Sequence, residues 1–282
     1  MIFQDWHTHS SLCRHAIGNL EDYVKSAINK NLNLIGFSAH FPYEFLKGIE
    51  NIPYEAYAMK LEDLYGYIRE AERLKKKYEN QIAIRIGFEI DYIKSQENSY
   101  KKYIKDHVKK LDYIIGSIHN LETEFGLFPF DDENFLFLYS RFDKIDEIFE
   151  LYYETLKSMV ESKMFEFDII GHFDLPKKFN KKPINRRKIS KLIDEILEIV
   201  KEKQIIIELN SSGLRKPVKE QYPSTEILKI MKSKEIPTLL GSDAHNPREI
   251  GYKFKEMVLI LKELGFNKLA NLEKRKMSFI QI

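Results

Sequence analysis

Residues 2–9 read IFQDWHTH, a short strand-like run that leads directly into two histidines. The apolar and aromatic side chains of residues 2–6 predict a strand. A helix-like segment follows at residues 20–30, and Asn19 with Asp22 three residues later is a typical helix start. This unit of a short apolar strand, a connection and an amphipathic helix is the pattern that decides the fold.

Similar units recur along the rest of the chain. The strand-like runs are short and rich in β-branched residues without clean alternation, which is typical of parallel strands buried on both faces. These runs are residues 2–6, 34–38, 82–90, 112–117, 167–171, 204–210 and 238–242. The stretches between them predict helices at residues 20–30, 54–78, 99–110, 144–163, 185–203, 224–234 and 247–264. A last apolar run, residues 277–282, is an eighth strand or a terminal extension.

The repeated alternation of strand and helix predicts the α/β class, with a parallel sheet and helical crossovers. A closed (β/α) barrel and an open doubly wound sheet both fit this pattern. The chain has 282 residues, and α/β barrels of about 250 residues form one unit. No linker rich in Gly, Ser or Pro divides the chain, so we expect a single domain over residues 1–282.

The charge balance argues against several classes of partner. The chain contains 45 Lys and Arg against 43 Asp and Glu, a net charge of +2 with both signs interleaved. A dedicated nucleic-acid or anionic-membrane binder shows a field of one sign, so we expect neither partner. The single cysteine, Cys13, excludes an internal disulfide and fits a reducing compartment. The N-terminus does not resemble a signal peptide, so we expect a cytoplasmic protein. The sequence does not indicate an oligomeric state.

Histidines and acidic residues gather at the ends of the predicted strands. Segments of about six residues after each strand cover ~15% of the chain, so roughly one histidine would fall there by chance. Six of the eight histidines do, together with two carboxylates. In parallel α/β folds the carboxyl ends of the strands meet at one rim, so we expect these side chains to converge. They are His7, His9, His40, Glu89, His119, His172, Asp243 and His245.

This set of side chains predicts a metal site. Histidine with carboxylate and without cysteine is a ligand set for divalent Zn, Mn, Fe or Co. His7 and His9 project from the same side of an extended segment, where they can bind one ion together. The set exceeds the four ligands of one tetrahedral site. We therefore expect two or three ions, with Glu89 as the bridging carboxylate.

Several other residues carry expectations of their own. Arg215 lies in a polar loop after the sixth strand, on the same rim, where a guanidinium can bind phosphate. His107 lies in a Lys-rich helical stretch and is expected at the surface. Cys13 is expected to be an inert buried residue. Asp5 and Trp6 are expected to pack against and support the metal site.

The long segment of residues 120–143 predicts a functional rim loop. Segments of this length are usually lids or disordered, and its seven aromatic residues argue against disorder. Asp131, Asp132 and Glu133 form an acidic cluster within it.

The motifs that carry these residues resemble one protein family. They are residues 5–10 (DWHTHS), His15, 36–42 (GFSAHFP), 87–91 (GFEID), 116–120 (GSIHN), 171–174 (GHFD) and 241–247 (GSDAHNP). In this order they resemble the PHP (polymerase and histidinol phosphatase) superfamily, over residues 2 to 255. Residues 208–217 (ELNSSGLRKP) are similar to the corresponding stretch of its monofunctional histidinol-phosphate phosphatases of histidine biosynthesis.

The resemblance implies a distorted (β/α)7 barrel with a trinuclear metal site at the C-terminal rim of the strands. The three ligand sets that it implies are His7, His9, Glu89 and Asp243; Glu89, His119 and His172; and His15, His40 and His245. The sequence departs from the family at Ala39, where the family commonly has Asp. His40 therefore lacks one local hydrogen-bond partner.

The resemblance also implies an enzyme, a metal-dependent phosphomonoesterase that hydrolyses L-histidinol phosphate. A hydroxide that bridges the ions would attack phosphorus, and Arg215 would hold the phosphate. Glu89, Asp243 and Arg215 are thus the expected catalytic residues.

The substrate would also present an ammonium group and an imidazole ring. We expect the rim loops to contact them, with carboxylates that pair with the cation and aromatic rings that stack on the imidazole. The candidates are Glu44, Asp131, Asp132 and Glu133. A PHP-type nucleotide or oligonucleotide phosphoesterase and a non-catalytic metal-binding PHP module are the alternatives; the near-neutral charge speaks against the former and the complete ligand set against the latter.

Overall fold

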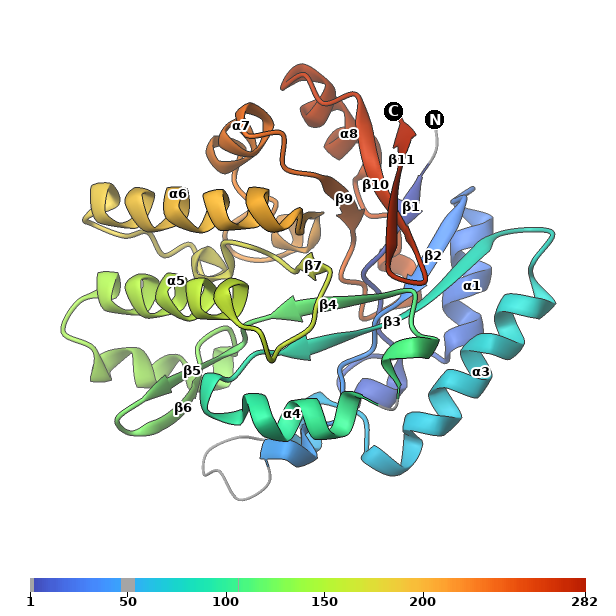
Figure 1. The fold of residues 1–282 in the computed structure, drawn as a ribbon, viewed down its shortest axis with the longest axis horizontal. Helices are drawn as coiled ribbons and strands as arrows, with labels where there is room; N and C mark the ends of the chain where they lie inside the picture. The colour runs from blue at the N-terminus through green and yellow to red at the C-terminus, as the bar shows by residue number, and fades with distance from the viewer. Residues whose placement is uncertain (1–2, 47–53, 106) are drawn as a thin grey trace.

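The computed structural model of the chain describes residues 3–46, 54–105 and 107–282. Ile2 of the first predicted strand, Asp106 of a predicted helix and most of the loop that follows Glu44 lie outside these residues. Seven strands form one parallel sheet in the order β1-β2-β3-β4-β7-β8-β9 (Figure 1). They are β1 (Gln4–Asp5), β2 (Leu34–Phe37), β3 (Ala83–Asp91), β4 (Tyr113–Ser117), β7 (Ile169–Ile170), β8 (Ile206–Asn210) and β9 (Thr238–Gly241). Each coincides with a predicted strand.

The sheet is nearly closed into a barrel. The first and last strands meet where the Trp6 N–H donates a hydrogen bond to the Leu240 carbonyl (3.0 Å). Just beyond the strands, Thr8 pairs in parallel with Ala244. Of the two arrangements that fit the sequence pattern, the barrel is therefore confirmed over the open sheet.

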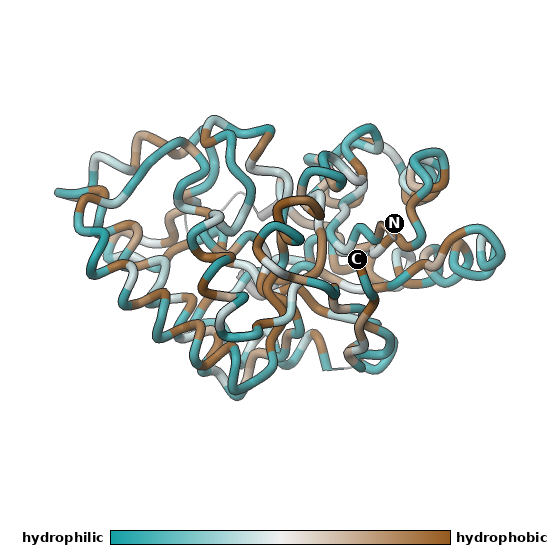
Figure 2. The backbone as a smooth tube through the Cα atoms, turned by 90° about the horizontal axis from the view of Figure 1, so that it is seen from above, coloured by the Kyte–Doolittle hydropathy of each residue, from teal (hydrophilic) through white to brown (hydrophobic). Residues whose placement is uncertain are grey.

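Helices surround the strands on the outside (Figure 1). They include α1 (Leu20–Asn29), α3 (Leu64–Lys77), α4 (Glu97–Ile104), α5 (Ile145–Glu161), α6 (Arg186–Lys203), α7 (Thr225–Ser233) and α8 (Phe254–Glu263). The predicted start of α1 is confirmed, since the Asn19 side chain accepts from the Asp22 N–H and the Asp22 carboxylate accepts from the Asn19 N–H. In the tube of Figure 2 the hydrophobic segments gather toward the middle of the molecule.

The prediction of one continuous helix over residues 54–78 is wrong. It is split into α2 (Tyr54–Tyr57), a 3₁₀ turn at Leu61–Asp63 and α3. The break has a tertiary cause, because the Leu61 N–H donates to Oε1 of Glu44 (2.7 Å) rather than to a helical carbonyl.

Two other helices also differ from the prediction. The segment predicted at 247–264 begins as a 3₁₀ turn, and α8 starts only at Phe254, because Gly251 and Lys253 have φ angles of +62° and +59°. The segment predicted at 99–110 ends its α-helix at Ile104. The surface position expected for His107 is wrong, since its side chain is 6% exposed and its ring lies 5.2 Å from that of Tyr65.

A C-terminal hairpin packs against the barrel interior. It pairs β10 (Lys268–Glu273) with β11 (Lys276–Gln281) in antiparallel fashion, so the predicted last strand exists but lies outside the main sheet. Ala270 and Leu272 join a buried cluster with Trp6 and other side chains of the barrel strands. At the turn, the Lys274 N–H donates to Oδ1 of Asp112 (3.0 Å), just before β4 begins. The hairpin therefore covers the N-terminal end of the barrel and leaves the C-terminal rim for the site.

The segment of residues 120–143 is ordered on that rim. It forms the hairpin β5 (Asn120–Thr123) and β6 (Gly126–Pro129), followed by a 3₁₀ helix at Glu133–Arg141. Phe128 and Phe130 are fully buried, and Phe130 packs on Tyr152 of α5 (ring centroids 5.4 Å apart). Most of its aromatic residues thus anchor the segment to the barrel.

Among the described residues, no helix is long and apolar enough to span a bilayer.

Candidate metal centre

The buried carboxylate of Glu89, near the end of β3, lies at the middle of the histidine cluster. Its side chain is 1% exposed, and both oxygens face imidazole nitrogens. Oε1 lies 2.9 Å from Nε2 of His172 and 3.5 Å from Nε2 of His119. Oε2 lies 3.0 Å from His7 Nε2, 3.3 Å from His9 Nε2 and 3.3 Å from His40 Nδ1. One carboxylate therefore connects five histidines from four different segments of the chain.

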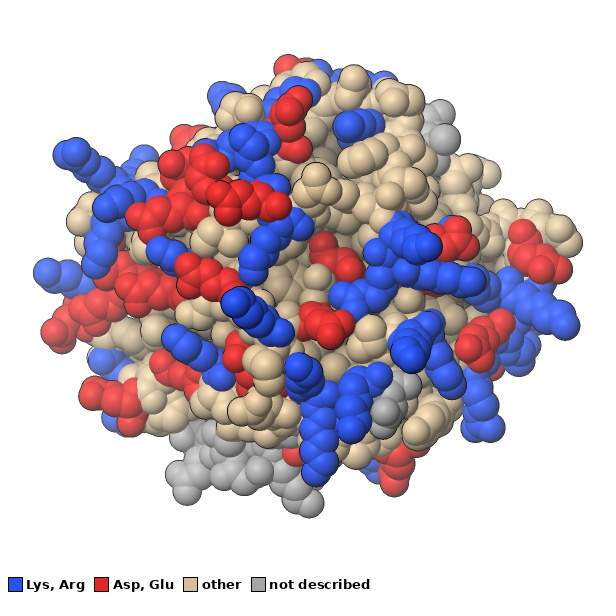
Figure 3. Space-filling model, viewed as in Figure 1, with Lys and Arg blue, Asp and Glu red and all other residues tan. Residues whose placement is uncertain are grey.

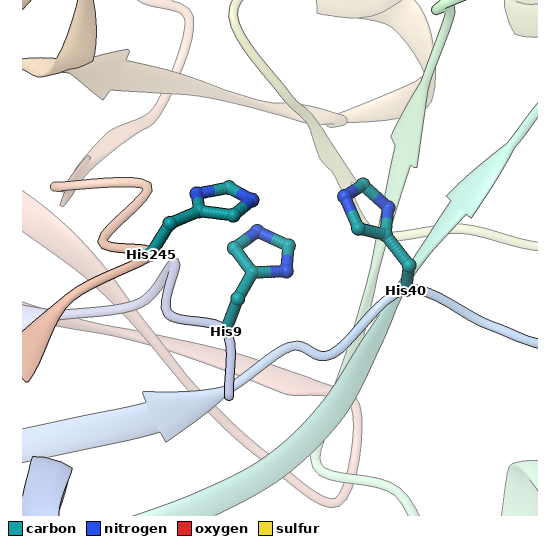
Figure 4. A group of neighbouring side chains, drawn as sticks. All are labelled: His9, His40 and His245. Carbon is teal, nitrogen blue, oxygen red and sulfur yellow. The ribbon is translucent and has the colours of Figure 1, made fainter. Parts of the chain in front are cut away.

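A second carboxylate, Asp243, completes the other side of the cluster. Its Oδ1 lies 3.2 Å from His9 Nε2 and 3.5 Å from His245 Nδ1. Nε2 of His245 in turn lies 2.8 Å from Nε2 of His15. Figure 4 shows the ring of His9 between those of His40 and His245. The centroid of the His9 ring lies 4.4 Å from that of His40 and 4.2 Å from that of His245.

All nine predicted ligands thus lie in one connected cluster. Three groups bring their ligand atoms within 4.8 Å of one another: His7, His9 and Glu89; His9, His40 and His245; and His40, Glu89 and His119. The groups overlap at His9, His40 and Glu89, so the ligand sets implied by the family remain predictions.

The donor atoms fit divalent cations. Nε2 of His7 and Nδ1 of His40 are buried, and although Oε2 of Glu89 lies 3.0 and 3.3 Å away, neither nitrogen forms a hydrogen bond among the residues described. Buried polar atoms without partners are rare in folded proteins because desolvating them is costly. A borderline divalent ion coordinated by imidazole and carboxylate would satisfy them.

The charges of the cluster divide its histidines into two kinds. Burial disfavours the charged form of His9 and of His119, but nearby acids outweigh it and raise the pKa of His9 to about 9 and that of His119 to about 10. Burial and the neighbouring histidines lower the pKa values of His40 and His245. An imidazole must be neutral to bind a metal. Ions that enter the site would therefore displace protons from His9 and His119.

Two of the predicted ligands occupy unusual backbone conformations. His172, two residues after β7, has φ +25°, and Asp243, two residues after β9, has φ +50°. Non-glycine residues rarely adopt positive φ, and such strain is concentrated at functional sites. The sharp turns aim both side chains back over the open end of the barrel.

Residues that sequence reasoning missed hold several ligands in place. The Asp91 carboxylate accepts from the His119 N–H (2.7 Å), and the Glu208 carboxylate lies 2.9 Å from Nδ1 of His7. Both are acidic residues within apolar strands, which is the signal that could have found them.

Asp5 and Cys13 also touch the cluster. As expected, Asp5 supports it, because its carboxylate accepts from the Ser242 N–H (2.9 Å) beside Asp243. Cys13 is buried, as expected, and it also contacts two of the histidines. Its Sγ lies 3.5 Å from His9 Nδ1 and accepts from the His40 N–H (3.2 Å).

A cavity of about 680 Å³ lies over the cluster. Its lining includes Arg215, Lys216 and Lys178 as cations, and Asp131, Asp132 and Glu133 as anions. The predicted acids of the rim segment therefore face the metal centre. Glu44 is not among the lining residues and instead accepts from the Leu61 N–H.

Arg215 is held rigidly at the cavity wall. Its Nη2 donates to the carbonyls of Ser242 (2.8 Å) and Asp243 (3.2 Å), and its Nε lies 3.3 Å from Glu249. Nη1 is buried and has no hydrogen-bond partner within the described part of the chain. One amino group thus fixes the guanidinium while the other is free to bind an anion.

Two comparisons of sequence relate the chain to known proteins. The PHP domain family matches residues 5–212. A probable histidinol-phosphatase of Deinococcus radiodurans is 31% identical over 97% of this chain and 97% of its own length. A histidinol-phosphatase of Bacillus subtilis is 30% identical over 89% of this chain and 97% of its own length.

The fold is likewise that of solved relatives. A putative histidinol phosphatase of Listeria monocytogenes superposes with a TM-score of 0.83 at 26% identity, covering 90% of this chain and 99% of that one. A histidinol phosphate phosphatase of Lactococcus lactis, solved with zinc, L-histidinol and phosphate, superposes with a TM-score of 0.78 at 19% identity, covering 98% of each chain.

Proposed function

Because this chain belongs to the PHP domain family, we propose that it is a metal-dependent phosphatase that hydrolyses L-histidinol phosphate to L-histidinol and phosphate. One observation carries the proposal: the nine clustered ligands lie beneath a single cavity whose wall holds Arg215 with a free Nη1. The relatives named for this activity align with nearly the whole chain, which supports the choice of substrate.

The cluster would hold two or three divalent ions, such as Zn, Mn or Fe. His7, His9 and Asp243 would bind on one side of Glu89, His119 and His172 on the other, and His15, His40 and His245 would complete the set. When bound, the ions supply neutralising charge for the phosphate and activate water at neutral pH. Phosphate-ester hydrolysis needs both, since it is among the slowest uncatalysed reactions.

Arg215 would bind and orient the phosphate. Its Nη2 and Nε are tied to Ser242, Asp243 and Glu249, so only Nη1 remains for a phosphate oxygen. A prepositioned charged donor stabilises the transition state without having to reorganise. The carbonyl of Asp243 accepts from the same guanidinium. This hydrogen bond fixes the position of the phosphate-binding group relative to a proposed metal ligand.

Three acidic residues that line the cavity, here called the acidic wall, would select the rest of the substrate: Asp131, Asp132 and Glu133. Asp131 is paired with Lys178 (2.9 Å), and although burial opposes it, Lys178 with His119 lowers the pKa of Asp131, so the carboxylate stays charged. The Asp132 carboxylate is hydrogen-bonded by the Tyr57 hydroxyl. Glu133 lines the cavity beside them. These carboxylates suit the ammonium group, which the metals and Arg215 do not recognise.

We propose that residues 1–282 form one phosphoesterase domain, because the C-terminal hairpin packs into the barrel. Lys and Arg are interspersed with Asp and Glu on the face in Figure 3, which does not favour a nucleic-acid partner. A cytoplasmic location suits the single buried thiol of Cys13.

Phosphate release from a set of substrates tests the proposed function. The purified protein, loaded separately with Zn, Mn and Fe, is assayed with L-histidinol phosphate, mononucleotides and a short oligonucleotide. We expect kcat/KM for L-histidinol phosphate to exceed the others by at least about a hundredfold, as for a site built to pair polar groups of one substrate. Equal or faster hydrolysis of a nucleotide would contradict the substrate, and no hydrolysis with any metal would contradict the activity.

A further inference from the structure

Glu208, in the middle of β8, is a fully buried carboxylate beneath the metal centre. Oε1 lies 2.9 Å from Nδ1 of His7. Oε2 accepts from the backbone N–H of His172 (3.1 Å) and from Nδ2 of Asn210 (3.0 Å). No lysine or arginine of the described ranges forms an ion pair with it. An unpaired buried charge is costly, so a carboxylate at this position needs an explanation.

The contact with Oε1 determines which nitrogen of His7 can bind a metal. An ionised carboxylate only accepts hydrogen bonds, so Nδ1 of His7 must carry the proton that it donates to Glu208. The lone pair of the ring is then on Nε2, which lies 3.0 Å from Glu89 and 3.7 Å from Asp243. The partner of a ligand histidine fixes its tautomer and ring orientation in this way.

The contact with Oε2 reaches the opposite side of the centre. It holds the backbone at His172, whose φ is +25° and whose Nε2 lies 2.9 Å from the other oxygen of Glu89. Glu208 therefore connects two ligands that Glu89 also connects, from below the cluster rather than from within it.

The neighbouring strand leaves space for this carboxylate. A Cβ on Gly241 of β9 would lie 1.6 Å from Oε1 of Glu208 and 2.8 Å from Cβ of His7. No side chain fits at Gly241 while Glu208 keeps its contact with His7. The absence of a side chain at Gly241 of β9 thus permits the hydrogen bond between Glu208 of β8 and His7.

We propose that Glu208 is a positioning residue for the metal centre. It holds His7 in the Nδ1-protonated tautomer with Nε2 directed at the ions, and it holds the turn that carries His172. The inference rests on the metal binding of the proposed function but not on the identity of its substrate.

Zinc affinity of the folded protein tests this role without any substrate. Zinc is titrated by competition with a chromogenic chelator into wild type, Glu208→Gln, Gly241→Ala and the matched control Asp168→Asn. The control makes the same carboxylate-to-amide change at the opposite end of the barrel, where Asp168 pairs with Arg275. We expect Glu208→Gln and Gly241→Ala to weaken at least one zinc equivalent by about 10- to 100-fold, the range for partners of ligand histidines. Asp168→Asn should keep wild-type affinity even if it melts earlier.

A spectrum of the wild-type protein gives a second readout that no folding defect can obscure. In zinc-loaded protein with ¹⁵N-labelled histidine, we expect zinc on Nε2 of His7 and a slowly exchanging proton on its Nδ1. Zinc on Nδ1 of His7, or wild-type zinc affinity in Glu208→Gln, would overturn the proposal. Normal zinc binding without hydrolysis of L-histidinol phosphate would instead contradict the proposed function alone.

Discussion

Oε1 of Glu89 lies 2.9 Å from Nε2 of His172, although 83 residues separate them in the chain. The second oxygen of the same carboxylate lies 3.0 Å from Nε2 of His7, which comes from the first strand end. Although burial opposes it, His7 and the other facing histidines lower the pKa of Glu89 well below its usual value, so the carboxylate stays charged. Glu89 would therefore supply negative charge to more than one bound cation.

Replacing Glu89 by Gln should remove this shared charge while keeping the side-chain shape. We expect a lower zinc content and a kcat/KM for L-histidinol phosphate reduced by at least about a hundredfold, the scale of one lost electrostatic contact. Metal analysis after dialysis and steady-state kinetics measure the two effects. A Glu89→Gln protein with full metal content and normal kinetics would contradict the bridging role.

Removing the guanidinium of Arg215 should impair catalysis more than metal binding. The group has one free donor, Nη1, and we expect Arg215→Ala to cost about 2–4 kcal/mol in transition-state stabilisation, roughly 30- to 1,000-fold in kcat/KM. Arg215→Lys keeps the charge but not the fixed fork, so it should recover only part of the loss.

Zinc content is the control for both Arg215 variants, because Nη2 contacts the carbonyl of the ligand Asp243. Loss of zinc in parallel with loss of activity would assign Arg215 to support of the metal site instead of the phosphate.

Removal of the metals should give the protein a stability maximum near pH 6.5. The pKa values of His9 and His119 are raised to about 9 and about 10, so their stabilising contribution is full below the ordinary value of 6.5 and is lost as the pH rises through 9 and 10. The pKa values of His15, His40 and His245 are lowered, so their contribution is full above 6.5 and is lost at lower pH.

Thermal melting of chelator-treated protein between pH 5 and 10 measures this curve. With zinc bound, the loss on the alkaline side should disappear, since metal affinity rises as competing protons leave the ligands. A Tm of the metal-free protein that rises steadily from pH 6.5 to 9 would contradict the raised pKa values.

The convergence of the predicted ligands could be foreseen because two local patterns coincide. Short apolar runs such as that ending at Phe37 mark parallel strands, and polar residues directly after them, such as His40, must lie on one rim. Neither pattern requires knowledge of distant contacts. For the same reason the seven barrel strands were predicted, whereas closure of the barrel depends on a contact between the strands of Trp6 and Leu240.

The supporting contacts could not be predicted in the same way. Glu208 meets His7 across 201 residues, and this contact depends on the register of β8 against β9 and on the meeting of β9 with the first strand. The break before α3 arises because the Leu61 N–H donates to the Glu44 carboxylate. The amphipathic pattern of the sequence continues across this break and does not reveal it. The burial of His107 likewise depends on a neighbour, Tyr65, that a Lys-rich local pattern does not reveal.

Substrate choice should depend on the acidic wall and not on the metals. Neutralising Asp132 and Glu133 together, as Asp132→Asn with Glu133→Gln, should lower kcat/KM for L-histidinol phosphate by about a hundredfold or more, since a site that pairs a polar group discriminates strongly when the pairing is lost. Hydrolysis of p-nitrophenyl phosphate, which has no ammonium group, should change little.

Glu124→Gln is the matched control, because Glu124 lies in the turn between β5 and β6 and is not among the residues that line the cavity. Tyr57→Phe separates the two carboxylates from their support, because it removes the hydroxyl that binds Asp132 but leaves both carboxylates in the chain. If the rim acids act by charge, Tyr57→Phe should have a much smaller effect on L-histidinol phosphate than the double variant. Equal losses on both substrates in the double variant would show that these acids support the cavity wall, and no loss on either would place the selecting groups elsewhere.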